Sequence, residues 1–163
     1  MLRLDDRDIL ILQVLSREGR LSKAELARRI NLSTSPAWER LKRLEAAGVI
    51  AGYRAEIELK SVAPHLVIFV TLELERHTPD SFRGFEALVN AYEEVTACWA
   101  LGGGFDYLMQ IVTRDIDSYQ DFMERLLSES TGIARYYTYV VTKPVKSAPP
   151  PLDTLINPDK PGG

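Results

Sequence analysis

The chain has 163 residues, 45% of them hydrophobic and 26% charged, with a net charge of −3; this composition excludes a disordered chain and fits one domain or two small ones. No apolar run approaches the roughly 18 to 20 residues that span a bilayer, and the charged segment 1–8 differs from the hydrophobic start of a signal peptide. We therefore expect a cytoplasmic protein with no membrane partner.

Basic residues are concentrated in the N-terminal part. Residues 1–63 contain 12 Lys or Arg against 9 Asp or Glu, whereas residues 64–163 contain 8 against 14. The basic residues of segment 20–43 are Arg20, Lys23, Arg28, Arg29, Arg40, Lys42 and Arg43. Such a patch gains affinity for a polyanion by releasing counterions from phosphates. Charge alone is equally compatible with a solvated basic face, so the motifs must decide.

Two helices are predicted in the first 31 residues. Asp5 is a suitable N-cap for the first helix, which carries a broad apolar stripe and ends near Gly19. Ser22 and Glu25 have the spacing of a capping box at the start of the second helix, which ends near Asn31.

A third helix is predicted over 36–48, with Ser35 as its N-cap and a proline at its first position. Helical spacing places Ala37, Leu41 and Leu44 on one face, which we expect to pack in the core. The opposite face has the polarity needed to read base edges in a DNA major groove. The candidate DNA-binding residues are Ser33, Thr34, Ser35, Trp38, Glu39, Arg40, Lys42 and Arg43.

Several of these side chains have alternative roles. Arg40 lies nearer the flank of the helix, where it suits a backbone phosphate or an intramolecular ion pair better than a base edge. Trp38 could pack against the second helix. Glu39 could pair with Arg43, because residues four positions apart are neighbours on a helix.

A strand and a linker are predicted after the third helix. Residues 49–59 contain an alternation that favours a strand, most clearly over 55–59, and this strand would flank a winged helix-turn-helix. Pro64 and the change in charge balance mark a linker over 60–64.

These boundaries divide the chain into three parts. We predict a DNA-binding domain over 1–62, a second domain over 63–146 and a Pro-rich tail over 147–163. The tail contains five of the nine prolines, so we expect it to be flexible or to lie on a partner, with the ordered core ending near Val145.

The second domain is predicted to contain both strands and helices. Strands are expected over 66–75, 95–101, 107–113 and 133–142, and helices over 82–92 and 115–127. Their order is that of a split βαβ, ferredoxin-like sandwich. The predicted fold class is α+β, with an N-terminal winged helix-turn-helix domain followed by a ferredoxin-like βαββαβ domain.

Three glycines lie between the two central strands. Residues 102–106 form either a tight hairpin, in which Asp106 accepts hydrogen bonds from backbone N–H groups, or part of a ligand site. The run lacks the Lys-Ser/Thr pair of a phosphate loop and is followed by a strand, which excludes a nucleotide site.

No metal or cofactor site is expected. Cys98 is isolated in an apolar stretch, and we expect a buried, reduced thiol. His65 and His77 have no neighbouring ligand at metal-binding spacing. The tyrosines at 136, 137 and 139 suit the packing of a sheet or subunit interface better than an aromatic ligand cage.

The order of these motifs resembles the Lrp/AsnC, or feast/famine, transcriptional regulators over about residues 4–146. The resemblance rests on segments 4–10 and 33–45, Leu26-Ala27, Gly48-Val49-Ile50 and Gly103-Gly104-Phe105-Asp106-Tyr107. It implies a homodimer that can assemble further into tetramers or octamers and binds DNA through paired helix-turn-helix domains. It also implies an amino-acid effector held near residues 102–106, at an interface between sensing domains, where binding shifts the assembly state.

Glycine occupies positions 102 and 104, where polar residues are frequent in the family that this chain resembles. Either backbone amides and neighbouring side chains bind the effector, or effector binding is weak or absent. The candidate effector-binding residues are Trp99, Gly102, Gly103, Gly104, Asp106 and Tyr107.

The functional hypothesis is a sequence-specific DNA-binding transcriptional regulator that recognises a partly palindromic double-stranded operator and responds to an amino acid. One alternative is an enzyme on the same fold, similar to sirohaem decarboxylases, which would use histidines and arginines around a tetrapyrrole. The other alternative is a non-specific DNA-compacting protein, which would bind every sequence with similar affinity.

Overall fold

The computed structural model describes residues 2–129 and 132–156, which divide into two units. The first unit combines the residues up to Ile57 with those from Lys146 onward, and the second runs from Glu58 to Val145. Each unit has its own hydrophobic core.

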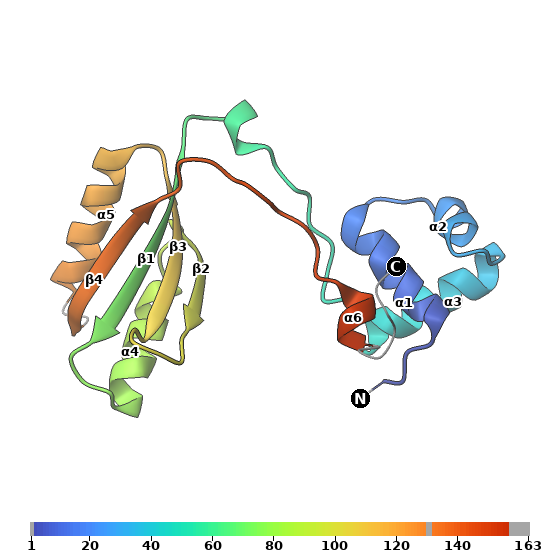
Figure 1. Ribbon diagram of the computed structural model, residues 1–163, viewed down its shortest axis with the longest axis horizontal. Helices are drawn as coiled ribbons and strands as arrows, with labels where there is room; N and C mark the ends of the chain where they lie inside the picture. Colours follow the sequence, from blue (N-terminus) through green and yellow to red (C-terminus); the bar gives the residue numbers. More distant parts are fainter. Residues whose placement is uncertain (1, 130–131, 157–163) are drawn as a thin grey trace. The chain divides into compact units, whose positions relative to one another are not determined.

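The first unit contains three helices near the N-terminus, α1 (Asp6–Arg17), α2 (Lys23–Arg29) and α3 (Thr34–Ala46) (Figure 1). The predicted N-cap of α1 is confirmed, because Asp5 and Asp8 each accept a hydrogen bond from the other's backbone N–H. Ser22 caps α2 as predicted and accepts from the Glu25 N–H at 3.1 Å. The Glu25 carboxylate binds arginines instead of completing the capping box.

Helix α3 begins earlier than predicted. Its N-cap is Ser33 rather than Ser35, and Pro36 is the third helical residue. The shift costs no hydrogen bond, because the N–H groups of the first turn have no acceptor within the helix in any case. The helix ends in a Schellman motif, in which Gly48 adopts a φ of +68° and the Val49 N–H donates to the Leu44 carbonyl at 3.0 Å.

The apolar faces of these three helices meet in one core. Its buried members are Ile11, Leu26, Ala27, Ile30, Ala37, Leu41 and Leu44. The predicted core face of α3 is therefore confirmed, since all three of its residues are in this set.

The strand predicted over 55–59 is wrong. Among the described residues no strand forms between 49 and 62, and a short 3-10 helix, η1 (Leu59–Ser61), occupies its end. A strand needs a neighbouring strand for its backbone groups, and an alternation in sequence does not supply one. Ile57 is 59% exposed, so the apolar side of the predicted strand is not buried.

The ordered part of the chain extends past Val145. Residues 152–156 form a short helix, α6 (Leu152–Ile156), which contacts α1 within the first unit (Figure 1). The Gln13 side-chain amide donates a hydrogen bond to the Asp153 carboxylate. Part of the predicted tail thus belongs to the first unit, and residues 157–163 lie outside the described residues.

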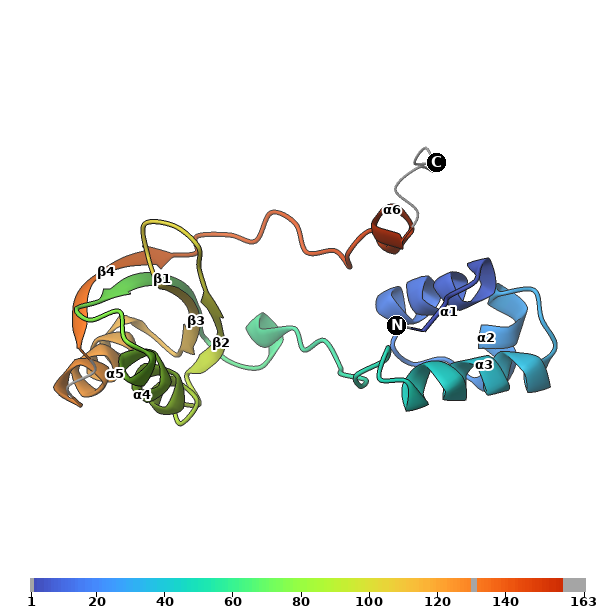
Figure 2. The same ribbon diagram turned by 90° about the horizontal axis from the view of Figure 1, so that it is seen from below.

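The second unit has the predicted order of elements. They are β1 (Leu66–Leu74), α4 (Pro79–Val89), β2 (Val95–Ala100), β3 (Tyr107–Thr113), α5 (Ile116–Ser128) and β4 (Ile133–Val140). The four strands form one antiparallel sheet in the order β2-β3-β1-β4, and both helices cover the same face (Figure 2). The predicted ferredoxin-like βαββαβ fold is confirmed.

Alternating side chains along β1, one of the two inner strands, point to opposite faces of this sheet. Ile68, Val70 and Leu72 point from β1 into the core with the helices and are 0% exposed. On the other face Trp99 and Tyr137 are 47% and 49% exposed. In the described part of the chain no helix is long and apolar enough to cross a membrane.

Candidate functional site

The first turn of α3 presents three hydroxyl groups to solvent. Ser33 is the N-cap by its backbone, but its side chain makes no capping hydrogen bond. Thr34 and Ser35 follow it, and all three are exposed. Among the described residues none of these hydroxyls has a hydrogen-bond partner, so they can bind an external group.

A buried carboxylate holds α3 against α1. Asp8 is 0% exposed, and its two oxygens accept from the Arg40 guanidinium at 2.9 Å and from the Arg43 guanidinium at 2.5 Å. Arg40 also donates to Asp5 at 2.6 Å. The Asp8 N–H and then the Arg40 guanidinium lower the pKa of Asp5, while hydrogen bonds to Asp5 and Asp8 raise the pKa of Arg40.

This arrangement changes the interpretation of the two arginines. Arg40 takes the intramolecular ion pair that its position on the flank of the helix allowed. Arg43 pairs with Asp8 and not with Glu39, which is exposed. Both guanidiniums therefore contribute to the fold of the first unit.

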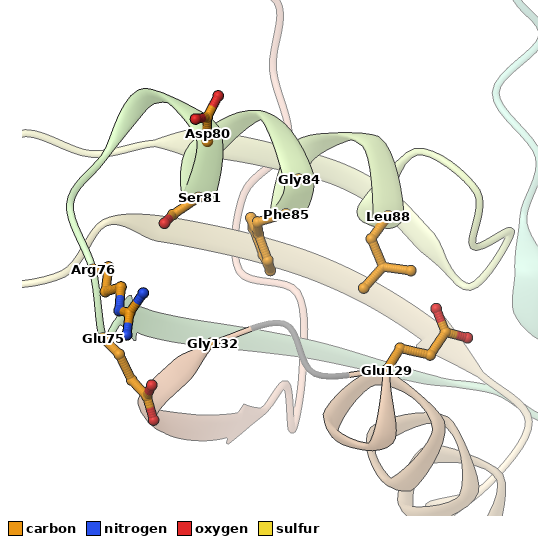
Figure 3. A pocket seen from close by; sticks show the side chains of 9 residues that line it. All are labelled: Glu75, Arg76, Asp80, Ser81, Gly84, Phe85, Leu88, Glu129 and Gly132. Atoms are coloured by element: carbon orange, nitrogen blue, oxygen red, sulfur yellow. The ribbon is translucent and has the colours of Figure 1, made fainter.

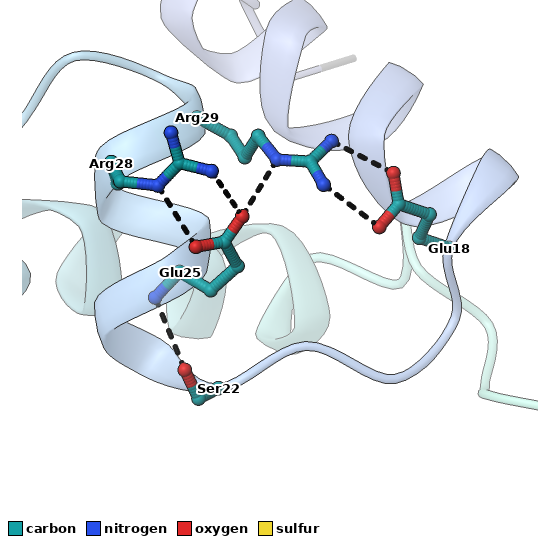
Figure 4. Close-up of polar contacts among 5 residues, drawn as sticks. All are labelled: Glu18, Ser22, Glu25, Arg28 and Arg29. Carbon is teal, nitrogen blue, oxygen red and sulfur yellow. Dashed lines mark hydrogen bonds and ion pairs between the residues drawn. The ribbon is translucent and has the colours of Figure 1, made fainter.

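A second ion-pair network covers α2 (Figure 4). The Glu25 carboxylate binds Arg28 at 2.6 Å and Arg29 at 2.7 Å, and Arg29 also binds Glu18 at 2.7 Å. The hydrogen bond from Arg28, followed by that from Arg29, lowers the pKa of Glu25 to about 2. These two arginines are also engaged within the protein.

The remaining basic residues of segment 20–43 are Arg20, Lys23 and Lys42. Among the described residues these three have no carboxylate partner. Trp38 is half-buried against the core, and the Lys23 Nζ lies 3.7 Å from its ring centroid. Lys23 is one of the seven basic residues of segment 20–43, and its distance of 15 positions from Trp38 gave no signal of this contact.

The glycine loop of the second unit is exposed. A Cβ added at Gly102, Gly103 or Gly104 would meet nothing within 4 Å, so the loop does not need glycine for its own conformation. The Asp106 carboxylate accepts from the Leu74 N–H at 2.7 Å and lies 3.0 Å from His77 Nε2. Asp106 thus ties the start of β3 to the end of β1. It accepts from a backbone N–H, but from one on β1 and not from one within the predicted hairpin.

The two aromatic candidates beside this loop lie on opposite faces of the sheet. Trp99 pairs with Leu108, whereas Tyr107 pairs with Ala100. Tyr107 is 3% exposed, and its hydroxyl donates to Glu86 at 2.8 Å. Burial and this hydrogen bond raise the pKa of Tyr107. Tyr107 is a core residue and does not reach a ligand that binds the exposed glycines.

A pocket of about 630 Å³, which we call the sheet-edge pocket, lies beside the end of β1, at the same end of the sheet as the glycine loop (Figure 3). It is lined by Glu75, Arg76, Asp80, Ser81, Gly84, Phe85, Leu88, Glu129 and Gly132. The sequence analysis missed this pocket, because its residues come from the end of β1, from α4 and from the two ends of the α5–β4 connection. His77, which contacts Asp106, directly follows Arg76 and brings the pocket close to the glycine loop.

The polar groups of this pocket carry both signs of charge. The Arg76 guanidinium and the Glu75 carboxylate have no partner among the described side chains. Asp80 pairs with Arg83, and Glu129 accepts from the Tyr92 hydroxyl at 2.9 Å. A zwitterion would find opposite charges here.

The two histidines have local partners, and the isolated cysteine is half-buried. Cys98 is half-buried beside a smaller pocket of about 330 Å³, and burial raises its thiol pKa to about 11, so the neutral thiol is the stable form. His65 Nδ1 lies 3.1 Å from the Ala63 carbonyl oxygen. No group of three metal-ligating side chains gathers among the described residues.

Comparison with known proteins gives matches to both units. Residues 4–51 match winged helix-turn-helix DNA-binding domains, and residues 67–151 match the Lrp/AsnC ligand binding domain. The transcriptional regulatory protein DoeX of Halomonas elongata is 48% identical over 145 residues, 89% of this chain and 92% of its own. The leucine-responsive regulatory protein of Escherichia coli is 37% identical over 145 residues, 89% of this chain and 88% of its own. A solved transcriptional regulator of Neisseria meningitidis in complex with L-Met has a TM-score of 0.88 and 37% identity, over 94% of this chain and 100% of that one.

Proposed function

The chain belongs to the Lrp/AsnC family of transcriptional regulators, and from that premise we propose that α3 reads a specific operator and that an amino acid bound at the sheet edge of the second unit alters this reading. The observation that carries the proposal is a set of exposed polar side chains at 33–35, 39 and 42, which have no hydrogen-bond or ion-pair partner among the described residues. Its hydroxyls at 33–35 and the Lys42 ammonium are available to DNA, whereas the arginines beside them are paired.

Each group on this surface suits a different part of DNA. The hydroxyls can bond base edges or phosphates, and the Glu39 carboxylate can accept from a cytosine amino group. Lys42 can bind a guanine edge or a phosphate. Arg40 and Arg43 contribute to DNA binding indirectly, because their hydrogen bonds to Asp8 fix the position of α3 on α1.

A dimer would present two copies of α3 to successive faces of the major groove. Two recognition helices need half-sites about one helical turn, or a multiple of it, apart, which fits a partly palindromic operator. Further assembly into tetramers or octamers would extend the protected DNA with the same period. Footprinting is expected to give this periodicity, and continuous protection without it would contradict the proposal.

The sheet-edge pocket supports an amino-acid effector. Arg76 can bind the α-carboxylate, and Glu75 with Asp80 can bind the α-ammonium group. Phe85 and Leu88 offer an apolar wall for a side chain. The Neisseria relative at 37% identity was solved with L-Met, which fits a ligand of this chemistry.

Fluorescence anisotropy tests both parts. The labelled DNA is the region upstream of the protein's own gene, compared with a scrambled sequence at fixed salt, with and without a panel of amino acids that includes L-Met and L-Leu. We expect preferential binding that one amino acid changes. Equal binding to both DNAs would contradict the regulator, and preference that the whole panel leaves unchanged would contradict the sensor.

Two substitutions locate the sites. Lys42→Ala is expected to weaken operator binding by about 1 to 3 kcal/mol, because a base or phosphate contact is lost while the fold is kept. Arg76→Met is expected to abolish the amino-acid response and leave DNA affinity unchanged. Arg114→Met, at an exposed arginine outside the pocket, is the matched control and should keep the response.

A further inference from the structure

The Trp38 ring lies close to two lysines of the DNA-binding unit that have no carboxylate partner among the described residues. Lys23 is the first residue of α2 and Lys42 lies in α3, and their Nζ atoms are 3.7 Å and 5.5 Å from the centroid of the Trp38 ring. Both distances are within the range of about 6 Å in which an ammonium group is attracted to an aromatic face. The two ammonium groups therefore converge on one ring from different helices.

The surroundings of the ring make it a fixed support. Trp38 packs against the buried residues of the first core and is itself half-buried, so its position is set by the fold. The arginines of α2 and α3 are engaged elsewhere, Arg40 and Arg43 with Asp8, and Arg28 and Arg29 with Glu25. Lys23 and Lys42 have no carboxylate partner among the described residues, so their charge is not neutralised within the protein.

We propose that Lys23 and Lys42 form a two-point clamp on the DNA phosphate backbone and that Trp38 is the positioning residue that holds them. The proposal rests on the proposed DNA-binding function and deepens it. It assigns Lys23 a contact that the sequence did not predict, and it assigns Trp38 a role in support instead of base reading.

Pre-organisation is the physical reason for such a clamp. A free lysine loses much side-chain freedom when its ammonium group is fixed on a phosphate. A lysine already held over an aromatic ring has lost part of that freedom before DNA arrives, so less is lost on binding. Contact with the ring face leaves ammonium N–H groups to donate to phosphate oxygens.

Salt dependence tests the clamp directly. Each phosphate neutralised contributes about 0.9 to the slope of log K against log salt concentration, whatever the DNA sequence. We expect Lys23→Ala and Lys42→Ala each to reduce the slope by about 0.9, and the double variant by about 1.8, on operator and scrambled DNA alike. Lys60→Ala, at a lysine in η1 without a carboxylate partner, is the control and should leave the slope unchanged. A slope that is unchanged in Lys23→Ala would overturn the clamp.

The role of Trp38 needs a coupling measurement. The loss of affinity caused by Lys23→Ala should be smaller in a Trp38→Leu background than in the wild type, because the support is already gone. Trp38→Phe keeps an aromatic face and should restore most of the affinity. If Trp38→Phe instead abolishes the preference for operator over scrambled DNA, Trp38 reads bases and the positioning role is wrong.

Two further measurements keep the outcomes separate. Circular dichroism and thermal melting establish that each Trp38 variant is folded; the lysine variants test the clamp independently of Trp38. A wild-type protein without operator preference would contradict the proposed function. The difference in salt slope between the wild type and Lys23→Ala on scrambled DNA would still decide whether Lys23 binds phosphate.

Discussion

The two units use charge in different ways. In the first unit a carboxylate that is 0% exposed, Asp8, joins two helices through guanidiniums of α3. In the second unit the core between sheet and helices is apolar, with Phe85 and Phe122 among its largest buried side chains. The number of basic residues in a segment therefore exceeds the number that can bind DNA, because some of them form ion pairs within the fold. At the edge of the apolar core of the second unit, Glu75 and Arg76 have no partner among the described side chains and can bind a ligand.

The largest expected effect is a core deletion in the second unit. Phe122 is 0% exposed, and its ring packs edge-on against the Tyr92 ring with 5.3 Å between the two ring centroids. Phe122→Ala should lower the free energy of unfolding of this unit by about 3 to 5 kcal/mol, because it removes buried apolar area and leaves a cavity. The fluorescence of Trp99 reports on this unit and that of Trp38 on the first unit. Urea unfolding in a Trp38→Phe background therefore follows the second unit, and unfolding in a Trp99→Phe background follows the first. A matching loss in the Trp38 signal would contradict independent cores.

The next effect tests the buried charge of the first unit. Asp8→Asn should destabilise this unit by about 2 to 3 kcal/mol, less than the about 3 to 5 kcal/mol of a fully buried pair, because Arg40 and Arg43 reach solvent. The Trp38 fluorescence in urea measures the loss. Glu39→Gln, at an exposed carboxylate on α3, is the control and should change stability little. Equal stability of the two variants would refute the central role of Asp8.

A smaller effect separates two serine caps within the first unit. Ser22→Ala should cost about 1 kcal/mol of stability, because it removes the bond to the Glu25 N–H. Ser33→Ala should change stability by less than about 0.5 kcal/mol, because the Ser33 side chain makes no cap bond. Ser33→Ala is nevertheless expected to weaken operator binding. Thermal melting and anisotropy on both variants check this division, and the reverse order of stabilities would contradict it.

The smallest effect is a dependence on acid. Because the pKa of Asp5 is lowered from its ordinary value of 3.8, its stabilising contribution is complete above that pH and is lost as the pH falls through the lowered value. Asp5→Asn keeps an N-cap and removes the titration. The loss of first-unit stability as the pH falls below 3.8 should be shallower in this variant. An unchanged pH profile of the Trp38 signal would show that Asp5 does not contribute.

Local patterns in the sequence predicted most of the fold. Capping residues such as Asp5 and Ser22 act within one helical turn, and the alternation along 66–74 depends on a single strand, so both can be recognised in a short window. The start of α3 was wrong by two residues because two serines compete as N-cap. The strand over 55–59 was wrong because pairing depends on a second segment.

The sites were harder to predict because they join distant residues. Arg40 and Asp8 are 32 positions apart, and no pattern near either one predicts their ion pair. The opposite orientation of Trp99 and Tyr107 depends on the register between β2 and β3. The sheet-edge pocket is lined by three segments, the end of β1, α4 and the α5–β4 connection, that only the folded chain brings together.

Helix α6 lies in the same unit as α1, far from it in the sequence. Its Asp153 binds Gln13, which leaves the ribosome about 140 residues earlier in synthesis. Proteins fold from the N-terminus as they are made, so α1 to α3 assemble first, the second unit follows, and α6 closes on α1 last. A deletion of α6 therefore acts on the DNA-binding unit, although the sensing unit precedes α6 in the sequence.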